Sequence, residues 1–235
     1  MIISVVLPAY KEEENLKNII PRLKKCLNNI EHEILVVDTM DPLDNTREIC
    51  DSLNVRYISR ECGNFYGDAI RTGFKYAKGK YLVIMDADGS HSPEDILVFY
   101  DYMRHNECDL VIGSRYCDGG YTDNNFILKF MSWVLNKTYS VVFSLNIKDV
   151  SDSFRMYKTE QVKKLELECS NFDIVEEILI KLNLSKENYI IKEIPISFNK
   201  REAGESKRNL LKFICSYLTT MNKLLSIQRK AKNKC

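Results

Sequence analysis

The chain has 235 residues, 45% hydrophobic and 29% charged, and its formal net charge is +1. This length and apolar content suffice for one folded domain with a sizeable core. Acidic and basic residues are interspersed and nearly balanced, which argues against a general nucleic-acid-binding protein.

Apolar runs typical of strands alternate with helical patterns through about residue 116. Strands are expected at 2–10, 32–39, 55–60, 80–88 and 108–116. Helices are expected at 11–27, 46–53, 66–79 and 92–106. Gly79 is the expected C-terminal cap of the third helix, and Ser92 is the expected N-cap of the fourth.

This alternation predicts an α/β fold, with a mostly parallel sheet covered by helices on both faces. Ligands of such sheets bind beyond the carboxyl ends of the strands. Four strands end there in charged or conformationally special residues, at 8–10, 38–39, 86–88 and 113–115. The sequence therefore predicts one shared cleft at that edge.

The second half has a different pattern. An amphipathic helix is expected at 125–146, a loop entering a strand at 149–158, a helix at 172–184, a strand at 189–198 and a polar loop at 199–209. The resulting organisation is one folded unit of residues 1–208, with halves 1–116 and 117–208, followed at 209–235 by an amphipathic helix and a basic tail.

Two features bear on location. Eight cysteines lack Cys-x-x-Cys or metal-type spacing, which favours reduced thiols and a cytoplasmic protein. No stretch reaches the roughly 20 apolar residues that span a bilayer. Membrane contact is therefore expected to be peripheral, through the helix at 126–146 and the C-terminal helix, or else both helices pack on protein.

Two aspartates, Asp86 and Asp88, follow the apolar run "YLVIM" directly. Residues two apart in an extended segment point the same way, so the carboxylates would repel unless a cation lay between them. These oxygen ligands suit Mg²⁺ or Mn²⁺, which commonly bridge to substrate phosphates. The alternative, an aspartate-rich turn capping the next helix, is weakened because Ser92 already supplies a cap.

Other charged residues have a structural and a functional explanation. Asp38 ends an apolar strand, where it either contacts a nucleobase or ribose or closes an Asx-type turn. Arg115, Arg155 and the basic residues of 201–207 are each best explained as solvated charges when taken singly. Since arginine and lysine also suit phosphate oxygens, the set together with the metal site indicates two anionic partners.

The ordered segments "VVLPAYKEEENL", "EILVVD", "YLVIMDADGSHSP", "DLVIGSRY", "DVSDSFRMYK", "FDIVEEIL" and "EIPISFNKREAGESK" resemble the dolichyl- and polyprenyl-phosphate sugar transferases. These are family 2 glycosyltransferases with the GT-A fold, in which a Rossmann-like sheet binds a nucleotide-diphospho-sugar. The resemblance runs from Ile3 to about Lys207 and implies a metal-dependent hexosyltransferase.

The resemblance also implies roles for individual residues. Those around the nucleotide would be Pro8, Tyr10, Glu12 and Asp38. The metal ligands would be Asp86, Asp88 and Ser90. Arg155, which stands in the same sequence segment as Asp149, would belong to the donor site. Ser206 would belong to the same site. The catalytic residues would be Asp88, Arg115 at the acceptor phosphate, and Arg201 and Lys207 closing over the diphosphate.

The sequence departs from the family pattern at two places. The usual second aspartate after the second strand is Thr39, and the usual Ser-Gly before Phe154 is Asp152-Ser153. Asp152 adds a negative charge near the expected acceptor phosphate, which leaves the acceptor class open.

The expected reaction moves a hexose with inversion from GDP-mannose or a UDP-hexose to a dolichyl or polyprenyl phosphate, at the cytoplasmic face of a membrane. A first alternative is a hydroxyl acceptor, for which Asp152 or Glu177 would be the base. A second is a sugar-nucleotide-binding protein without activity, against which the intact Asp-x-Asp and Arg-x-x-Gly-x-Ser-Lys patterns argue. The sequence leaves the donor nucleotide and an oligomeric state open.

Overall fold

The structure, a computed structural model, describes residues 1–200 and 210–232. The elements of its first half are β1 (Ile3–Pro8), α1 (Glu13–Cys26), β2 (His32–Asp38), α2 (Thr46–Ser52), β3 (Arg56–Ser59), α3 (Tyr66–Tyr76), β4 (Tyr81–Ile84), α4 (Asp95–His105) and β5 (Leu110–Ser114). Those of its second half are β6 (Tyr121–Thr122), α5 (Phe126–Val142), β7 (Arg155–Lys158), α6 (Thr159–Val162), α7 (Ile174–Ser185), β8 (Ile191–Pro195), β9 (Ser197–Phe198) and α8 (Leu210–Lys232).

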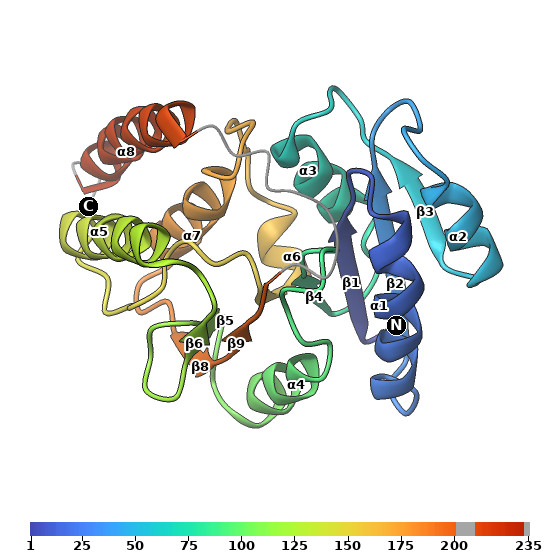
Figure 1. The fold of residues 1–235 in the computed structure, drawn as a ribbon. Coiled ribbons are helices and arrows are strands. Elements are labelled where there is room, and N and C mark those ends of the chain that lie inside the picture. The colour runs from blue at the N-terminus through green and yellow to red at the C-terminus, as the bar shows by residue number, and fades with distance from the viewer. Residues whose placement is uncertain (201–209, 233–235) are drawn as a thin grey trace.

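The strands form a seven-stranded sheet in the order β3-β2-β1-β4-β7-β5-β8. Figure 1 shows its first four strands, β3, β2, β1 and β4, in that order across the sheet. All neighbouring strands pair in parallel except β7, which is antiparallel to both β4 and β5. A separate parallel pair, β6 and β9, lies outside this sheet. The predicted mostly parallel α/β fold is confirmed.

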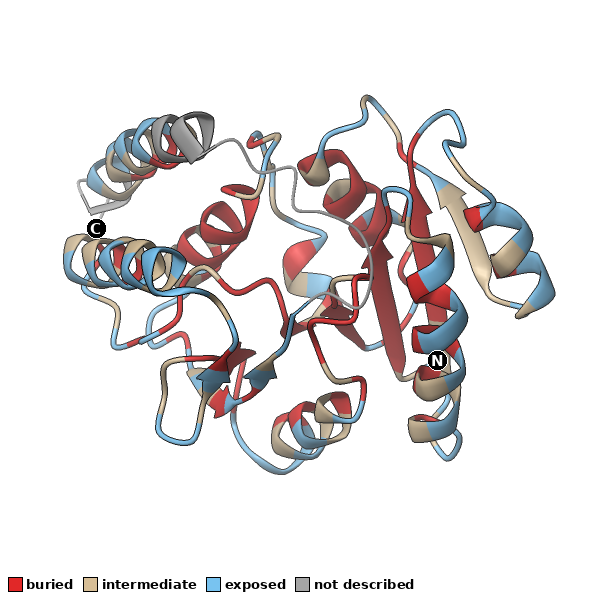
Figure 2. Ribbon diagram, in the orientation of Figure 1, coloured by how far each residue is buried: buried red, intermediate tan, exposed pale blue. Residues whose placement is uncertain are grey.

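Helices cover both faces of the sheet because its central strands are apolar on both sides. Every residue of β1 and β4 is buried, as Figure 2 shows in red. Val5 and Leu7 pack in one core cluster with Leu16 of α1 and Phe99 of α4. The intervening Val6 packs in the other cluster, which contains side chains of α3, α5, α7 and α8. The two-residue period of a strand thus divides β1 between two cores.

The two predicted helix caps were wrong in detail. Helix α3 ends at Tyr76 with Ala77 as its C-cap. A Cβ atom on Gly79 would lie 2.6 Å from the backbone nitrogen of Ser4, so this glycine allows close approach to β1. Helix α4 begins at Asp95 rather than near Ser92, because Pro93 and Glu94 form a turn.

The second half is less regular than the sequence predicts. The expected strand at 189–198 is divided between β8 and β9, which belong to different sheets. The short elements β6 and α6 were not predicted. The helices expected at 125–146 and in the tail are present as α5 and α8. In the described part of the chain, no helix is both long and apolar enough to cross a membrane.

Candidate functional site

A cavity of about 240 Å³ opens at the carboxyl ends of β1 and β4. We call it the β1–β4 pocket. Its walls are Pro8, Ala9, Tyr10, Glu12, Arg60, Asn64, Phe65, Tyr66, Asp86, Ala87, Asp88, Asn171 and Phe172. Because parallel strands end at the same edge, two of the four predicted strand exits meet here.

A smaller cavity of about 40 Å³, the Arg115 pocket, shares Asp86 and Phe172 with the first. Its other walls are Arg115, Ser132, Ser151, Asp152, Ser153, Val175, Phe198 and Tyr217. A third strand exit, that of β5, therefore contributes to an adjoining pocket. The cleft predicted from four strand exits is therefore formed by three of them, as two adjoining pockets that share Asp86 and Phe172, and the exit at 38–39 lines neither pocket.

Asp86 and Asp88 lie where a metal site was expected. The Asp86 carboxylate accepts a hydrogen bond from the Tyr66 hydroxyl at 3.3 Å. The Asp88 carboxylate accepts one from the Ser90 backbone N–H at 3.0 Å. Neither aspartate is the N-cap of α4, which is Glu94, so the capping alternative receives no support.

The donor set at these aspartates fits a hard divalent cation. The Ser90 hydroxyl is buried and has no hydrogen-bond partner among the described residues. No group of three or more metal-type side chains occurs in residues 1–200 and 210–232. Mg²⁺ and Mn²⁺ do not need one, since they are commonly held by one or two carboxylates, with waters and substrate phosphates as further ligands.

The nucleotide residues expected from the sequence divide into two groups. Pro8, Tyr10 and Glu12 line the β1–β4 pocket, and Tyr10 is exposed. Asp38 does not line it. It is 1% exposed and accepts a hydrogen bond from the Tyr57 hydroxyl at 3.3 Å. Burial raises the pKa of Asp38. This position does not place Asp38 beside a base or ribose in the β1–β4 pocket, and its carboxylate closes no Asx-type turn, since the Met40 N–H donates to Asn64 instead.

Sequence reasoning missed several residues that line the β1–β4 pocket, among them Arg60, Tyr66 and Phe172. Arg60 is buried in its wall and donates to the backbone carbonyls of Asn64, at 2.6 Å, and of Ala9. The rings of Tyr66 and Phe172 stack with centroids 4.5 Å apart. The stacked rings form an aromatic wall that suits a flat base, whereas the Arg60 guanidinium is engaged by backbone carbonyls and supports the wall. Phe172 comes from a segment far along the chain, so no local pattern could reveal it.

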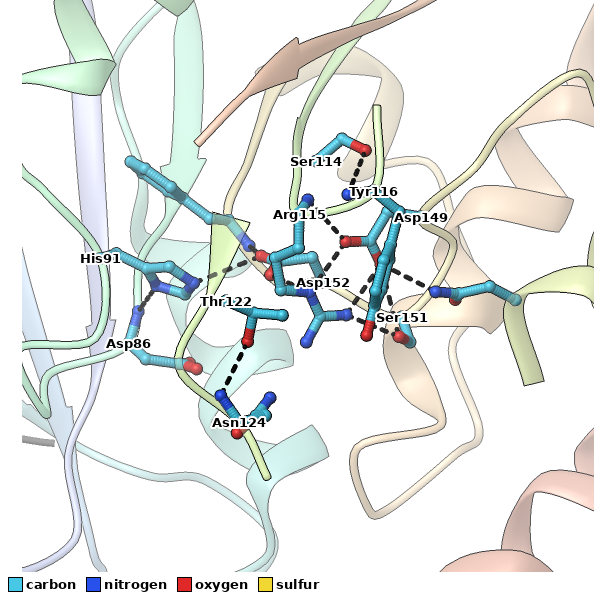
Figure 3. A network of polar contacts seen from close by, with 12 residues as sticks. Asp86, His91, Ser114, Arg115, Tyr116, Thr122, Asn124, Asp149, Ser151 and Asp152 are labelled. Atoms are coloured by element: carbon cyan, nitrogen blue, oxygen red, sulfur yellow. Dashed lines mark hydrogen bonds and ion pairs between the residues drawn. The ribbon is translucent and has the colours of Figure 1, made fainter. Parts of the chain in front are cut away.

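Arg115 is held in a fixed orientation by carboxylates (Figure 3). Its Nε and Nη2 donate to the two oxygens of Asp149, each at 2.8 Å, and Nη2 also donates to the Ser151 hydroxyl at 2.8 Å. Although burial opposes the charge, Asp149 and Asp152 raise the pKa of Arg115. The rings of Tyr116 and Phe198 lie beside the guanidinium, with their centroids 5.3 and 5.4 Å from Cζ. Nη1 makes no hydrogen bond among the described residues, so this donor remains for an anion.

The departure at Asp152 has a structural explanation. Its carboxylate lies 3.1 Å from Nε of Arg115 and 3.3 Å from Nε2 of His91 (Figure 3), and it accepts a hydrogen bond from the Phe154 N–H. Burial disfavours the charge, but Arg115 and His91 hold the pKa of Asp152 below its usual range. The extra negative charge is therefore matched by neighbours, and so weak a base is unsuited to activating a hydroxyl.

His91 was missed by sequence reasoning, although it stands in the quoted segment "DADGSHSP". Its Nδ1 accepts from the Asp86 backbone N–H at 3.3 Å, which leaves the proton on Nε2, toward Asp152. The ring stacks on Phe154 with centroids 4.7 Å apart. The imidazole thus joins the aspartate loop after β4 to the loop before β7.

Two expected roles do not fit the structure. Arg155 is fully buried and donates to the backbone carbonyls of Asp152, Val175 and Val150, so it supports the loop instead of binding a donor. Glu177 is also fully buried. It accepts from the backbone N–H groups of 168 and 169 and from Lys181, which excludes it as an accessible base. Arg201, Ser206 and Lys207 lie outside the described residues.

An apolar groove of about 260 Å³ lies between α5 and α8. We call it the α5–α8 groove. Its lining residues are Phe130, Met131, Val134, Leu135, Thr138, Tyr139, Tyr217, Leu218 and Met221. Tyr217 thus lines both this groove and the Arg115 pocket. A polar pocket that contains the Arg115 guanidinium thus adjoins an apolar groove, with Tyr217 as their common wall, and this arrangement suits an amphiphile with an anionic head.

Comparisons with known proteins agree with this arrangement. The sequence model of glycosyl transferase family 2 matches residues 4–166. The chain is 36% identical over 214 residues to a dolichol-phosphate mannosyltransferase of Pyrococcus furiosus, an alignment that covers 88% of this chain and 59% of that protein. It is 30% identical over 222 residues to an undecaprenyl-phosphate mannosyltransferase of Micrococcus luteus, covering 88% and 87%.

Solved structures show the same fold. The glucosyl-3-phosphoglycerate synthase of Mycobacterium tuberculosis, in complex with Mn²⁺, UDP and phosphoglyceric acid, superposes with a TM-score of 0.75 and 17% identity. The match covers 96% of this chain and 78% of that one. The same enzyme in complex with Mg²⁺ and UDP gives a TM-score of 0.72 at 17% identity, covering 96% and 78%. The predicted GT-A architecture is confirmed.

Proposed function

Because the chain belongs to glycosyl transferase family 2, we propose that it moves a hexose, with inversion, from a nucleoside diphosphate sugar to a polyprenyl phosphate. The observation that carries this proposal is Tyr217, where the Arg115 pocket meets the α5–α8 groove. The relatives named for dolichol-phosphate and undecaprenyl-phosphate support the same acceptor class. The chain spans 59% of the length of the Pyrococcus relative.

In the proposed reaction the donor lies in the β1–β4 pocket, with its diphosphate at Asp86 and Asp88. Mg²⁺ or Mn²⁺ held there would offset the charge that develops on the departing diphosphate. We assign the same task to Arg201 and Lys207, and diphosphate binding to Ser206. Arg115 binds the acceptor phosphate through Nη1, and an oxygen of that phosphate attacks the anomeric carbon from the face opposite the diphosphate.

A phosphate acceptor needs positioning more than a base, because it is already ionised near neutral pH. The two carboxylates considered for activating a hydroxyl are both engaged: Asp152 by Arg115 and His91, Glu177 by backbone N–H groups and Lys181. This favours the lipid phosphate over a hydroxyl acceptor. The chain's membership of a transferase family, together with its pair of metal-type aspartates, disfavours a non-catalytic binding protein.

The test is a matrix of radiolabelled GDP-mannose and UDP-hexoses against polyprenyl phosphate and glycan hydroxyl acceptors, each with Mn²⁺ or EDTA. We expect label to enter the organic phase only with polyprenyl phosphate and Mn²⁺. Label in a water-soluble glycan would replace the proposal by the hydroxyl alternative. Donor binding without transfer to any acceptor would favour the non-catalytic one.

We also propose that the enzyme works at the cytoplasmic face of a membrane, bound peripherally through α5. This helix carries large apolar side chains in contact with solvent, including Phe126, 82% exposed, and Trp133, 56% exposed. Exposed apolar area of this kind on an amphipathic helix favours a bilayer surface. Arg229 and Lys230, exposed near the end of α8, suit anionic headgroups.

Replacing Phe126 and Trp133 together by serine is expected to lower partition onto phospholipid vesicles about 100-fold, since burying each such side chain is worth about 1.5–3 kcal/mol. Vesicle flotation measures this. The matched control is Val98→Ser, which removes an exposed apolar side chain from α4, 51% exposed. If the double variant floats as well as the wild type, α5 is not the membrane-binding surface.

A further inference from the structure

Helix α8 contributes Tyr217, Leu218 and Met221 to the α5–α8 groove, and of these Tyr217 also lines the Arg115 pocket. Tyr217 is 5% exposed, and it is the residue shared by the Arg115 pocket and the α5–α8 groove. Its ring lies edge-on to Tyr139 of α5, with centroids 6.4 Å apart at 83°. The Tyr139 hydroxyl donates to the Tyr217 backbone carbonyl at 2.9 Å. The helix is therefore attached to α5 at the position where polar pocket and apolar groove meet.

A second attachment lies one helical turn further along. The Thr220 hydroxyl donates to the Asp173 carboxylate at 2.5 Å, and the sulfur of Cys169 lies 3.4 Å from the same hydroxyl. All three residues are buried. Thr220 follows Tyr217 by three residues, so the two side chains lie on the same face of α8.

The acceptor of this hydrogen bond, Asp173, is the neighbour in sequence of another lining residue of the Arg115 pocket. Asp173 immediately follows Phe172, which lines both the β1–β4 pocket and the Arg115 pocket. One buried contact therefore joins the residue after Phe172 to the helical turn that carries Tyr217. Shifting α8 would move one wall of the Arg115 pocket relative to the other.

We propose that α8 is part of the acceptor site: Tyr217 forms the wall where the phosphate end of the acceptor meets its hydrocarbon chain, and Thr220 and Asp173 are positioning residues that hold it there. This inference rests on the proposed function and adds a requirement to it. The C-terminal helix determines acceptor binding directly, independently of any contribution to membrane affinity. Donor binding uses the β1–β4 pocket, which no residue of α8 lines and where the Phe172 ring is also held by stacking on Tyr66, so we expect it to change little.

The test compares Thr220→Val with Thr219→Val. Both changes replace a hydroxyl by a methyl group on α8, but Thr219 is exposed and lines neither pocket nor groove. Activity and equilibrium binding are measured with a short-chain prenyl phosphate in detergent micelles, so that affinity for a bilayer does not enter. Thermal melting establishes that each variant is folded.

For Thr220→Val we expect KM and Kd for the prenyl phosphate to rise about tenfold, because the variant loses one charge-assisted hydrogen bond. KM for the sugar nucleotide should stay within twofold, and so should all constants of Thr219→Val. Thr220→Ser, which restores the hydroxyl, should recover wild-type acceptor binding. Tyr217→Ala should raise KM and Kd for the prenyl phosphate at least as much, again without changing KM for the sugar nucleotide.

Two results would overturn the inference, and they differ from failure of the proposed function. If the wild type binds and glycosylates prenyl phosphate but Thr220→Val behaves like Thr219→Val, α8 is not part of the acceptor site. If Thr220→Val weakens the binding of the sugar nucleotide and of the prenyl phosphate equally, the contact between Thr220 and Asp173 only stabilises the fold. A wild-type enzyme that neither binds nor glycosylates prenyl phosphate refutes the proposed acceptor, and the role of α8 with it.

Discussion

Asp88→Asn is expected to abolish metal-dependent sugar transfer, with at least a 1,000-fold fall in kcat/KM for the sugar nucleotide. Asparagine keeps the size of the side chain and an oxygen that accepts from the Ser90 N–H, so only the charge is lost. A cation that stabilises a departing diphosphate is worth several kcal/mol, and each 1.36 kcal/mol corresponds to about tenfold in rate.

Initial rates over a Mn²⁺ titration, together with Mn²⁺ binding followed by electron paramagnetic resonance, measure this effect. The matched control is Asp101→Asn, which removes a carboxylate exposed on α4 and paired there with Arg104. Its rates should equal those of the wild type. Wild-type Mn²⁺ affinity in Asp88→Asn would show that the metal site lies elsewhere.

Arg115→Lys is expected to lower kcat/KM for the acceptor about 100-fold or more while KM for the donor stays unchanged. Lysine keeps the positive charge but lacks the planar guanidinium. Arginine can bind both oxygens of Asp149 and still direct Nη1 to the acceptor phosphate, and lysine cannot. Hydrogen bonds to charged groups contribute about 1.5–3 kcal/mol each, so losing two accounts for this magnitude.

Steady-state kinetics with each substrate varied in turn separates the two constants. Arg104→Lys is the control, because Arg104 pairs with Asp101 on the exposed surface of α4. An equal rise in both KM values would place Arg115 in the donor site. An unchanged acceptor KM would contradict its assignment to the acceptor phosphate.

The aspartate pair illustrates what local sequence can establish. "YLVIMDAD" contains a buried strand, its end and two acidic residues in one continuous segment, so the position of Asp86 and Asp88 at the cleft follows from alternation alone. The same reasoning was inaccurate for the adjoining helix. Ser92 has the residue type of a cap, but the Pro93–Glu94 turn delays α4 until Asp95.

Arg155 and Asp38 show where residue type is insufficient. Both are charged residues next to the predicted cleft, and the sequence expected both to contact ligands. In the structure, three backbone carbonyls bind the Arg155 guanidinium and Tyr57 binds the Asp38 carboxylate. Whether a charged side chain points to a ligand or satisfies buried polar groups depends on which backbone segments pass beside it, and this is a property of the packed chain.

The sequence by itself determined the mostly parallel sheet, the apolar helices at α5 and α8 and the aspartates at the strand exit, because each depends on the periodicity of neighbouring residues. Only the tertiary structure decided that β7 inserts between β4 and β5. That insertion brings the loop of Asp149 and Asp152 to Arg115 and His91. Tertiary packing likewise placed Tyr217 where pocket and groove meet. These contacts join residues tens of positions apart, and pairing over such distances is fixed by the packing of the whole chain.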